Sequence, residues 1–591
     1  MKNINWHLRN ILSLISVVAV MFLHGCSSGG GGSAAPSNSI SGTAAAGAPI
    51  VGYVSVRDSS SNTQPVLQNI AIEANGNYTV DVTGLTPPFA FLASGTVGGR
   101  NVSLYSAATS ADVGGTINIT PFTDLIIRNI AAGAVDTYLS NPANMANLTT
   151  AELNAQRDTL TAQLAPALTA MGLSGSIDLL RATFNADSTG LDRFMDVVKV
   201  TPDPASSNVT ITNILDAANT LIVDTATGAA TGTVGTASLA PTGTPLDDIL
   251  ATFNTFTAQF ATSLPSPTDP VLTGLFSSTF LDDGETAAPL LTNLTTDPAL
   301  IGMRFANVVI DTIDAVAGTA TVHFMVLSAA GESLATDQPG GAVRWEMKRN
   351  ASGVWQFNGN QRIAYMGIRT GAYKVTCNPA NAACTGPATY STGLSLDISN
   401  RAMIDIGSAL VTGPGLPGGG VTLTAQAGQT QLFITTPNTG GSGTHWAMAD
   451  ADIPSVIPNS VYTVQLFNAA ATLIATYTAV VPAAPILNAD LPTFAFPSAS
   501  GLVDLAGIGA ATLTPSWSIP SGLWGGDITV YVTSLNNDNQ YVRAAARTAT
   551  GTASLVITAP ALPDTTWLRG EYWVYATDQN GGMVGTGYQS Y

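Results

Sequence analysis

The sequence predicts a multidomain protein that is built mainly of β-structure. The chain has 591 residues, whereas single domains are typically about 100–150 residues long. Only 10% of the residues are charged and 45% are hydrophobic. Short alternating apolar stretches recur between turn-forming residues, for example at 394–398, 462–466 and 528–532. We therefore expect, in chain order, a β-sandwich, a small helical bundle, an α+β domain and two further β-sandwiches.

The first residues predict export and attachment to a lipid. A positively charged start precedes the apolar run 11–23, which is shorter than the about 20 residues of a membrane-spanning helix. The run ends in Leu23-His24-Gly25-Cys26, which resembles the lipobox of bacterial lipoproteins. The resemblance implies a signal peptide at 1–25 and a lipidated Cys26. Because Ser27 rather than an aspartate follows, it also implies the outer membrane. The alternative is an ordinary secretory signal in which Cys26 is incidental.

A flexible tether is expected directly after the anchor. Residues 26–39 are rich in Gly, Ser and Ala, a composition that behaves as a random coil. The tether would hold the folded part of the chain away from the lipid. We expect a lipid-anchored protein of the outer membrane, with the cell surface favoured over the periplasmic face.

The charge balance limits the classes of partner. The chain has 20 Lys+Arg against 38 Asp+Glu, which gives a net charge of −18. Binding to nucleic acid or to anionic lipid depends on clustered basic residues, so neither partner is expected. The sequence contains no metal-ligand spacing, no dinucleotide fingerprint and no Gly-x-Ser-x-Gly elbow. We therefore expect no cofactor and no metal.

Two cysteines remain besides Cys26. Cys377 and Cys384 enclose the turn-rich segment 378–383. In an oxidising cell envelope this pair predicts a disulfide that closes a short loop. A metal site is the alternative, although no histidine lies near the pair.

Residues 40–118 predict the first β-sandwich. Ser41-Gly42-Thr43, Gly47-Ala48-Pro49-Ile50 and the hairpin signal Asn75-Gly76-Asn77-Tyr78 carry a resemblance to the carboxypeptidase-regulatory-like sandwich of bacterial surface proteins. That resemblance implies a spacer or a binding platform, and it implies no peptidase activity.

Residues 119–225 predict a small helical bundle that packs on the first sandwich. Thr120-Pro121 and the capping box at 149–152 begin two helices, and we expect further helices at 191–198 and 210–224. The segment 185–192 lacks the complete calcium-loop pattern, so we interpret it as a helix N-terminus. Residues 226–244 are rich in Gly, Thr and Ala and predict a linker.

Residues 245–370 predict an α+β domain. An amphipathic helix at 246–260 precedes expected strands at 305–313, 320–327, 343–347 and 354–363. This order, together with the tryptophan strand from Trp355 to Arg362, resembles the nuclear-transport-factor-2-like cone. The resemblance implies an apolar pocket that is used either for a ligand or for catalysis.

His323 is the candidate functional residue of that pocket. It alternates with Thr321 and Met325 on its predicted strand, so it would face one side of the sheet. A catalytic histidine needs an acidic partner within hydrogen-bond reach. Asp311 and Glu346 on neighbouring strands are the candidates, together with Asp314 at the end of the first of them. The alternative, which we favour, is a structural or surface histidine.

Residues 371–487 and 488–591 predict two immunoglobulin-like β-sandwiches. Pro515-Ser516-Trp517 and the strand at 528–531 resemble a fibronectin-type-III module. The tryptophans of this region suggest either a carbohydrate-stacking surface or large core residues, and we favour the core. These tryptophans are Trp517, Trp524, Trp567 and Trp573.

The function that these observations favour is a non-enzymatic, lipid-anchored scaffold. It would bind a protein or a surface glycan, or assemble with like proteins, through its β-modules. The alternative is a periplasmic carrier or enzyme that uses the pocket of residues 245–370. A polysaccharide hydrolase would instead need two carboxylates in a cleft, which a sequence cannot place.

Overall fold

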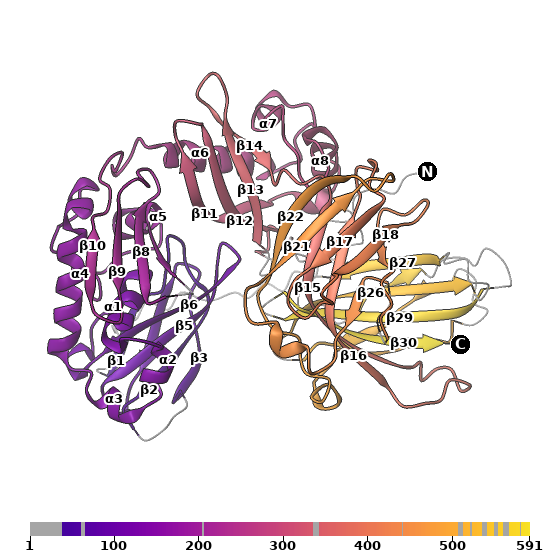
Figure 1. The fold of residues 1–591 in the computed structure, drawn as a ribbon, viewed down its shortest axis with the longest axis horizontal. Helices are drawn as coiled ribbons and strands as arrows, with labels where there is room; N and C mark the ends of the chain where they lie inside the picture. The colour runs from indigo at the N-terminus through magenta and orange to yellow at the C-terminus, as the bar shows by residue number, and fades with distance from the viewer. Residues whose placement is uncertain are drawn as a thin grey trace, which may run out of the picture.

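The computed structural model confirms a multidomain, mainly β architecture with several antiparallel sheets and few helices (Figure 1). It describes residues 38–60, 65–203, 206–331, 333–334, 342–439, 441, 443–505, 512–520, 523–534, 541–548, 554–558, 567–578 and 581–590. The predicted lipidation site Cys26 lies outside these residues. Among the described residues, none of the helices combines the length and the hydrophobicity of a membrane-spanning segment.

The first unit is a β-sandwich. A two-stranded sheet of β1 (Ser39–Thr43) and β4 (Asn77–Asp81) packs against a four-stranded sheet in the order β3-β2-β5-β6. The four strands are β2 (Val51–Asp58), β3 (Leu67–Ala71), β5 (Phe89–Val97) and β6 (Arg100–Ala108). The predicted turn at Gly76 is present, with φ at +87°, but it joins the two sheets instead of forming a hairpin.

Helices follow the sandwich, as predicted. They are η1 (Ser110–Asp112), α1 (Pro121–Ala131), α2 (Val135–Leu139), α3 (Pro142–Ala146), α4 (Thr150–Ala170) and α5 (Gly190–Val197). Thr120 caps α1 by accepting from the Thr123 amide, and Thr149 caps α4 by accepting from the Glu152 amide. The segment 185–192 leads into the N-terminus of α5, in agreement with its interpretation from the sequence.

The helix predicted at 210–224 is wrong. This region holds two strands of an antiparallel sheet with the order β10-β9-β8-β7. Val209 and Ile211, and then Leu221 and Val223, are buried at every second position, which is the period of a strand. The sheet also extends into the predicted linker 226–244. Its strands are β7 (Val198–Pro202), β8 (Asn208–Asn213), β9 (Thr220–Asp224) and β10 (Ala229–Gly232).

The next unit has the predicted order of one long helix and then four strands. Its antiparallel sheet runs β11-β12-β13-β14, and α6 packs on one face of it. The helices are α6 (Pro245–Phe260), α7 (Pro270–Gly274), α8 (Ala287–Leu294) and η2 (Pro298–Leu300). The strands are β11 (Arg304–Asp314), β12 (Thr319–Leu327), β13 (Ala342–Arg349) and β14 (Trp355–Gly359). In Figure 1 this unit lies between the N-terminal and C-terminal parts.

The expected boundaries inside residues 40–370 do not separate independent cores. One continuous hydrophobic cluster includes Phe122 and Phe194 from the helical region and Phe253 and Phe324 from the unit that follows. Val309 of β11 instead belongs to the core of the first sandwich. Apolar burial therefore continues from each unit into the next.

The C-terminal half is built on one mixed sheet of seven strands, in the order β20-β16-β15-β30-β29-β26-β27. A five-stranded sheet in the order β19-β18-β17-β21-β22 covers part of it. The first sheet contains β15 (Tyr365–Cys377), β16 (Thr389–Ser399), β20 (His445–Ala447), β26 (Leu523–Ser534), β27 (Tyr541–Thr548), β29 (Trp567–Asp578) and β30 (Met583–Ser590).

The covering strands complete two separate cores. The five-stranded sheet contains β17 (Ser408–Thr412), β18 (Val421–Ala425), β19 (Leu432–Ile434), β21 (Ser460–Phe467) and β22 (Leu473–Val481). The short 3-10 helices η4 (Ile453–Ser455) and η5 (Leu491–Thr493) lie in the connections. Two small strand pairs cover the other part of the seven-stranded sheet. They are β23 (Ser498–Ser500) with β25 (Ser516–Ser518), and β24 (Thr512–Leu513) with β28 (Ile557–Thr558).

The two predicted C-terminal sandwiches share this sheet, which differs from the expectation of separate modules. β15 pairs in parallel with β30, with Ala372 opposite Val584. The predicted boundary between 370 and 371 falls inside β15. Alternating hydrophobicity tells which face of a strand is buried, but it does not identify the neighbouring strand, so this pairing was not predictable from local pattern.

The predicted disulfide is confirmed, because Cys377 and Cys384 are bonded. The bond closes a loop at the end of β15. Within this loop, the Asn378 amide donates to the Gln589 carbonyl at 2.8 Å, and the Asn378 side chain donates to the Val503 carbonyl at 2.8 Å. The loop thereby fastens the end of the β15–β30 pair.

We expect the double variant C377S/C384S to lower the free energy of unfolding by about 2 kcal/mol, because an open loop restores conformational freedom to the unfolded chain. Thermal denaturation with and without a reductant measures this effect. The reductant should lower the melting temperature of the natural chain to that of the variant and leave the variant unchanged. Equal melting temperatures for the oxidised natural chain and the variant would contradict the stabilising role.

Candidate functional site

His323 lies between two units and does not face the interior that α6 covers. Its strand neighbours Val322 and Phe324 point into the aromatic core under α6, so His323 points to the opposite face of the sheet. There it meets the β5–β6 turn of the first sandwich, and only 3% of His323 is exposed. A Cβ added at Gly98 of this turn would come within 2.7 Å of the His323 ring.

Aromatic side chains fill the interior that the sequence suggested as a pocket. The ring of Phe253 lies 5.0 Å from those of Phe324 and Phe357, measured between centroids. Phe256 stacks on Phe305 at 4.2 Å. The described rings therefore pack on one another where a ligand was expected, which corrects the expectation that His323 and its partners line this space.

Asp311 is the acidic partner of His323, as the sequence suggested. The His323 Nδ1 lies 3.1 Å from the Asp311 carboxylate, and Arg100 of β6 donates to the same carboxylate at 2.7 Å. Burial opposes ionisation of Asp311, but the hydrogen bond and charge of His323 and the charges of Arg100 and Lys199 hold its pKa below the usual value. The three side chains join the first sandwich to β11 and β12.

The other two acidic candidates do not join His323. Glu346 is exposed on β13 opposite Thr321, and among the described residues no hydrogen bond connects it to His323. Asp314 accepts from the amides of Val316 and Ala317, so it caps the turn after β11. Both carboxylates are on the predicted strands, but neither takes part in the buried contact.

A second set of charged side chains lies beside this contact and was missed by sequence reasoning. Asp192 and Asp196 on α5 are 1% and 6% exposed, and Lys199 follows on β7. Burial is the main cause that raises the pKa of Asp192 to about 6 and that of Asp196 to about 7. Burial also lowers the pKa of Lys199, against the charges of Asp196 and Asp311.

The sequence contained one indication that these two aspartates are buried, namely their position on a short helix among apolar residues. Asp192 and Asp196 are four residues apart and flank Phe194 and Met195, so helical spacing places both carboxylates on one side. Whether that side is buried depends on the first sandwich. A Cβ added at Gly47 would come within 2.7 Å of the Asp196 carboxylate, which shows how closely the two units approach.

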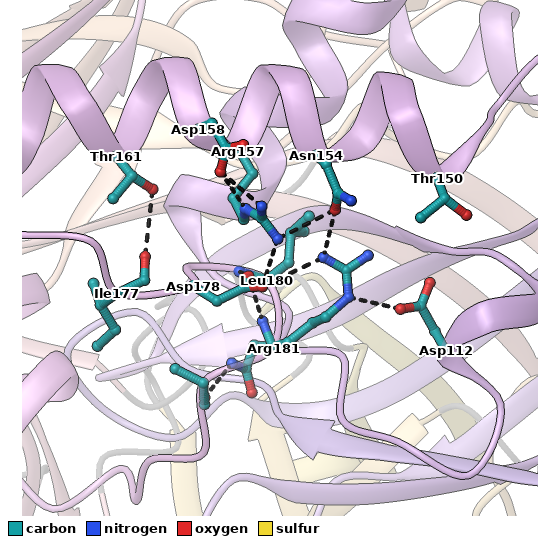
Figure 2. A network of polar contacts seen from close by, with 12 residues as sticks. Asp112, Thr150, Asn154, Arg157, Asp158, Thr161, Ile177, Asp178, Leu180 and Arg181 are labelled. Carbon is teal, nitrogen blue, oxygen red and sulfur yellow. Dashed lines mark hydrogen bonds and ion pairs between the residues drawn. The ribbon is translucent and has the colours of Figure 1, made fainter.

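A third polar network joins the first sandwich to α4 (Figure 2). Arg181 donates to Asp112 at 2.6 Å and to Asn154 of α4 at 3.0 Å. Arg157 of α4 donates to Asp178 at 2.6 Å. Asp112 is buried, and Arg181 provides the oppositely charged partner that a buried carboxylate needs.

His445, the second histidine of the described chain, lies on β20. Its Nε2 is 2.9 Å from the Ser391 hydroxyl, which places a nucleophile type and a base type together. However, burial lowers the pKa of His445 to about 4, and among the described residues its Nδ1 has no hydrogen-bond partner. The nearby Asp397 is bound by Arg369 and by Thr444. The carboxylate that orients the base in a catalytic triad is therefore not in place.

The ionisable side chains at this contact are better suited to holding two units together than to catalysing a reaction. His323 is buried between two units, and the partly exposed Asp311 is occupied by His323 and Arg100, whereas general acid–base catalysis requires contact with a substrate. Among the described residues, no group of three or more His, Cys, Asp or Glu side chains is arranged to hold a metal ion.

Comparison with known proteins gives little further information. No protein-family model and no curated protein matches the chain. One similar solved structure is described as the "crystal structure of tetra-tandem repeat in extending region of large adhesion protein". It is 11% identical, and the match covers 49% of this chain and 74% of that one with a TM-score of 0.13. A TM-score this low carries no argument about the fold.

The raised pKa of Asp196 leads to a prediction about stability. Its folded pKa of about 7 lies above the value near 3.9 of an unfolded chain, so the folded state loses stability as the pH rises between these values. We expect Asp196→Asn to remove this loss. The variant should be more stable than the natural chain at pH 8, by at least about 1 kcal/mol, and the difference should shrink toward pH 4.

Thermal denaturation across this pH range measures the effect, with the exposed Glu73→Gln as a matched control that should change nothing. Asp311→Asn should have the opposite effect and destabilise the fold throughout this pH range, because the lowered pKa of Asp311 stabilises the folded state above the unfolded value. This contribution is lost only when the pH falls below about 4. A destabilising effect of Asp196→Asn at pH 8 would contradict the argument.

Proposed function

We propose that this chain is a lipid-anchored outer-membrane protein that acts as a binding, adhesion or assembly scaffold. Its β-units would form the contact surfaces, and Cys26 and the segment 26–39 would provide the anchor and the tether. The observation that carries the proposal is the contact between two units in which buried His323 and partly buried Asp311 meet exposed Arg100 of the first sandwich. The side chains that could act as acid and base in catalysis instead hold two units together, as a scaffold requires.

Other contacts between the units support the same function. The turn at Asp282–Asp283 meets the start of the C-terminal half, where the Gly284 amide donates to the Arg362 carbonyl at 2.7 Å. Arg401 lies 3.7 Å from the Asp283 carboxylate and 4.2 Å above the Tyr365 ring. With the Arg181 network and the shared seven-stranded sheet, each unit is tied to the next by specific contacts.

The proposal also includes the fold families of the individual units. We propose that residues 40–118 form a carboxypeptidase-regulatory-like sandwich, that 245–370 form a nuclear-transport-factor-2-like unit, and that the last two sandwiches are immunoglobulin-like. The carboxypeptidase-regulatory-like resemblance implies a spacer or a binding platform, in keeping with a scaffold. The similarity to a repeat of an adhesion protein is compatible with adhesion, but it is too weak to add support. The alternative of a carrier or enzyme gains no support, because aromatic rings fill the proposed pocket.

Protease treatment of intact cells tests the proposal, with an antibody against residues 488–591 as the readout. We expect this region to be digested in intact cells, because a surface scaffold is exposed to the medium. A periplasmic marker that stays intact and a lysed sample that is digested are the controls.

The variant Cys26→Ala is the matched control for the anchor, and we expect it to leave the membrane fraction. Protection of the 488–591 region in intact cells, followed by digestion after lysis, would contradict a surface scaffold. That outcome would place the protein in the periplasm.

A further inference from the structure

One face of the seven-stranded sheet carries aromatic side chains outside both C-terminal cores. Ala372, Tyr572 and Val574 are buried on the core side of the sheet. The residues that alternate with them, Tyr373, Trp573 and Tyr575, point to the opposite side and are half-buried. These three side chains are called the aromatic platform below.

The rings of the aromatic platform contact one another across three adjacent strands. Trp573 and Tyr575 of β29 are parallel, with 2° between their planes and 5.4 Å between their centroids. Tyr373 of β15 lies edge-on to them at 6.1 and 6.4 Å. β30 runs between the two strands that supply the rings.

Glycines allow the rings to lie close against the sheet. The residues opposite Trp573 and Tyr575 on β30 are Gly587 and Gly585. A Cβ at Gly587 would come within 2.8 Å of Trp573, and one at Gly585 within 2.7 Å of Tyr575. Any larger residue would push the rings away from the backbone. The sequence of β30 is therefore suited to this arrangement of the rings.

Polar contacts fix the orientation of the rings. The Trp573 Nε1 donates to the Glu571 carboxylate at 3.0 Å, and the Gln589 amide donates to the same carboxylate at 3.1 Å. The Tyr373 hydroxyl lies 2.7 Å from the Ser395 hydroxyl. Rings that are already held in place lose little conformational freedom on binding a ligand.

His445 provides an independent observation at the edge of the platform. Its ring lies 4.7 Å from that of Tyr373, and it is 8% exposed. Its Nδ1 is buried without a hydrogen-bond partner among the described residues, although buried polar atoms normally have one.

We propose that the aromatic platform binds a neutral carbohydrate chain. A sugar ring presents a face of C–H groups that packs on an aromatic ring, and its hydroxyls exchange hydrogen bonds with carboxylates, amides and hydroxyls. The described polar groups at the rim, Glu571, Gln589 and Ser391, are acidic or neutral. With a net charge of −18, the protein would repel an anionic glycan.

This inference rests on the proposed scaffold function and names the ligand class of one of its surfaces. It also refines the sequence-based expectation for the tryptophans. Trp517 is buried in the core, as favoured from the sequence, whereas Trp573 belongs to the platform. The side chains of Trp524 and Trp567 lie outside the described part of the structure.

Affinity electrophoresis of the detergent-solubilised full-length protein tests the proposal. The gels contain one of four neutral polysaccharides, namely hydroxyethylcellulose, amylopectin, galactomannan or glycol chitin, and polygalacturonate serves as the anionic comparison. We expect retardation by at least one neutral polysaccharide and none by polygalacturonate.

Trp573→Leu is the decisive variant, because leucine still covers Gly587 but has no flat ring. We expect it to weaken binding about tenfold, which corresponds to a loss of about 1.4 kcal/mol, because the stacked ring is removed. Tyr575→Leu should act in the same way. Tyr53→Ala, at a 53% exposed tyrosine of the first sandwich, is the matched control and should bind like the natural chain. Melting temperatures of all variants show whether they are folded.

Three results would overturn the proposal. The first is that none of the four neutral polysaccharides retards the natural protein, and the second is retardation by polygalacturonate alone. The third result is undiminished retardation of the folded Trp573→Leu and Tyr575→Leu variants. Because the purified protein is used, its location in the cell does not enter the result. Failure here leaves a surface scaffold that binds another partner, whereas protection from protease in intact cells removes the scaffold function itself.

Discussion

The parallel pairing of β15 with β30 is the interaction on which the C-terminal half of the protein depends. It places Gly371 beside Met583, two residues that are far apart in the sequence. Closing so long a loop lowers the entropy of the chain, and the pairing is stable only because apolar residues are buried along with it. Ile368 and Leu396 enter one core and Tyr572 and Val574 enter the other, on the same face of the sheet. The opposite face is left for the aromatic platform, so one pairing organises both cores and the proposed binding surface.

Charged groups have a different role in the N-terminal half. A buried charge without a partner is strongly unfavourable, so Asp311 is stabilised by Arg100 and His323, and Asp112 by Arg181. Such pairs add little net stability compared with apolar packing, but they disfavour arrangements in which a partner is missing. Asp196 differs, because its raised pKa shows that burial outweighs its favourable contacts. The contact between α5 and the first sandwich is therefore expected to respond to pH.

The sequence pattern predicted individual helices and strands better than it predicted which elements pack or pair with one another. The N-caps of α1 and α4 are local, and so is the disulfide, because its cysteines are seven residues apart. The region 210–224 was misassigned because its isoleucines and leucines fit both a helical and a strand period in so short a segment. Alternation correctly grouped His323 with Thr321 and Met325, but it could not tell that this face meets Gly98 of another unit. The burial of Asp192 and Asp196, and the approach of Tyr373 to Trp573, also depend on segments that are distant in the sequence.

The pairing of β15 with β30 joins the two cores of the C-terminal half in one sheet. Hydrogen–deuterium exchange of the full-length protein, followed by mass spectrometry of peptides, tests it most directly. Slow exchange is expected throughout β15 and β30, in the same range as β17 and β21, because amides of paired strands open only with their core. Exchange of β30 as fast as that of exposed loops, with β17 and β21 still protected, would contradict the pairing and the shared sheet that depends on it.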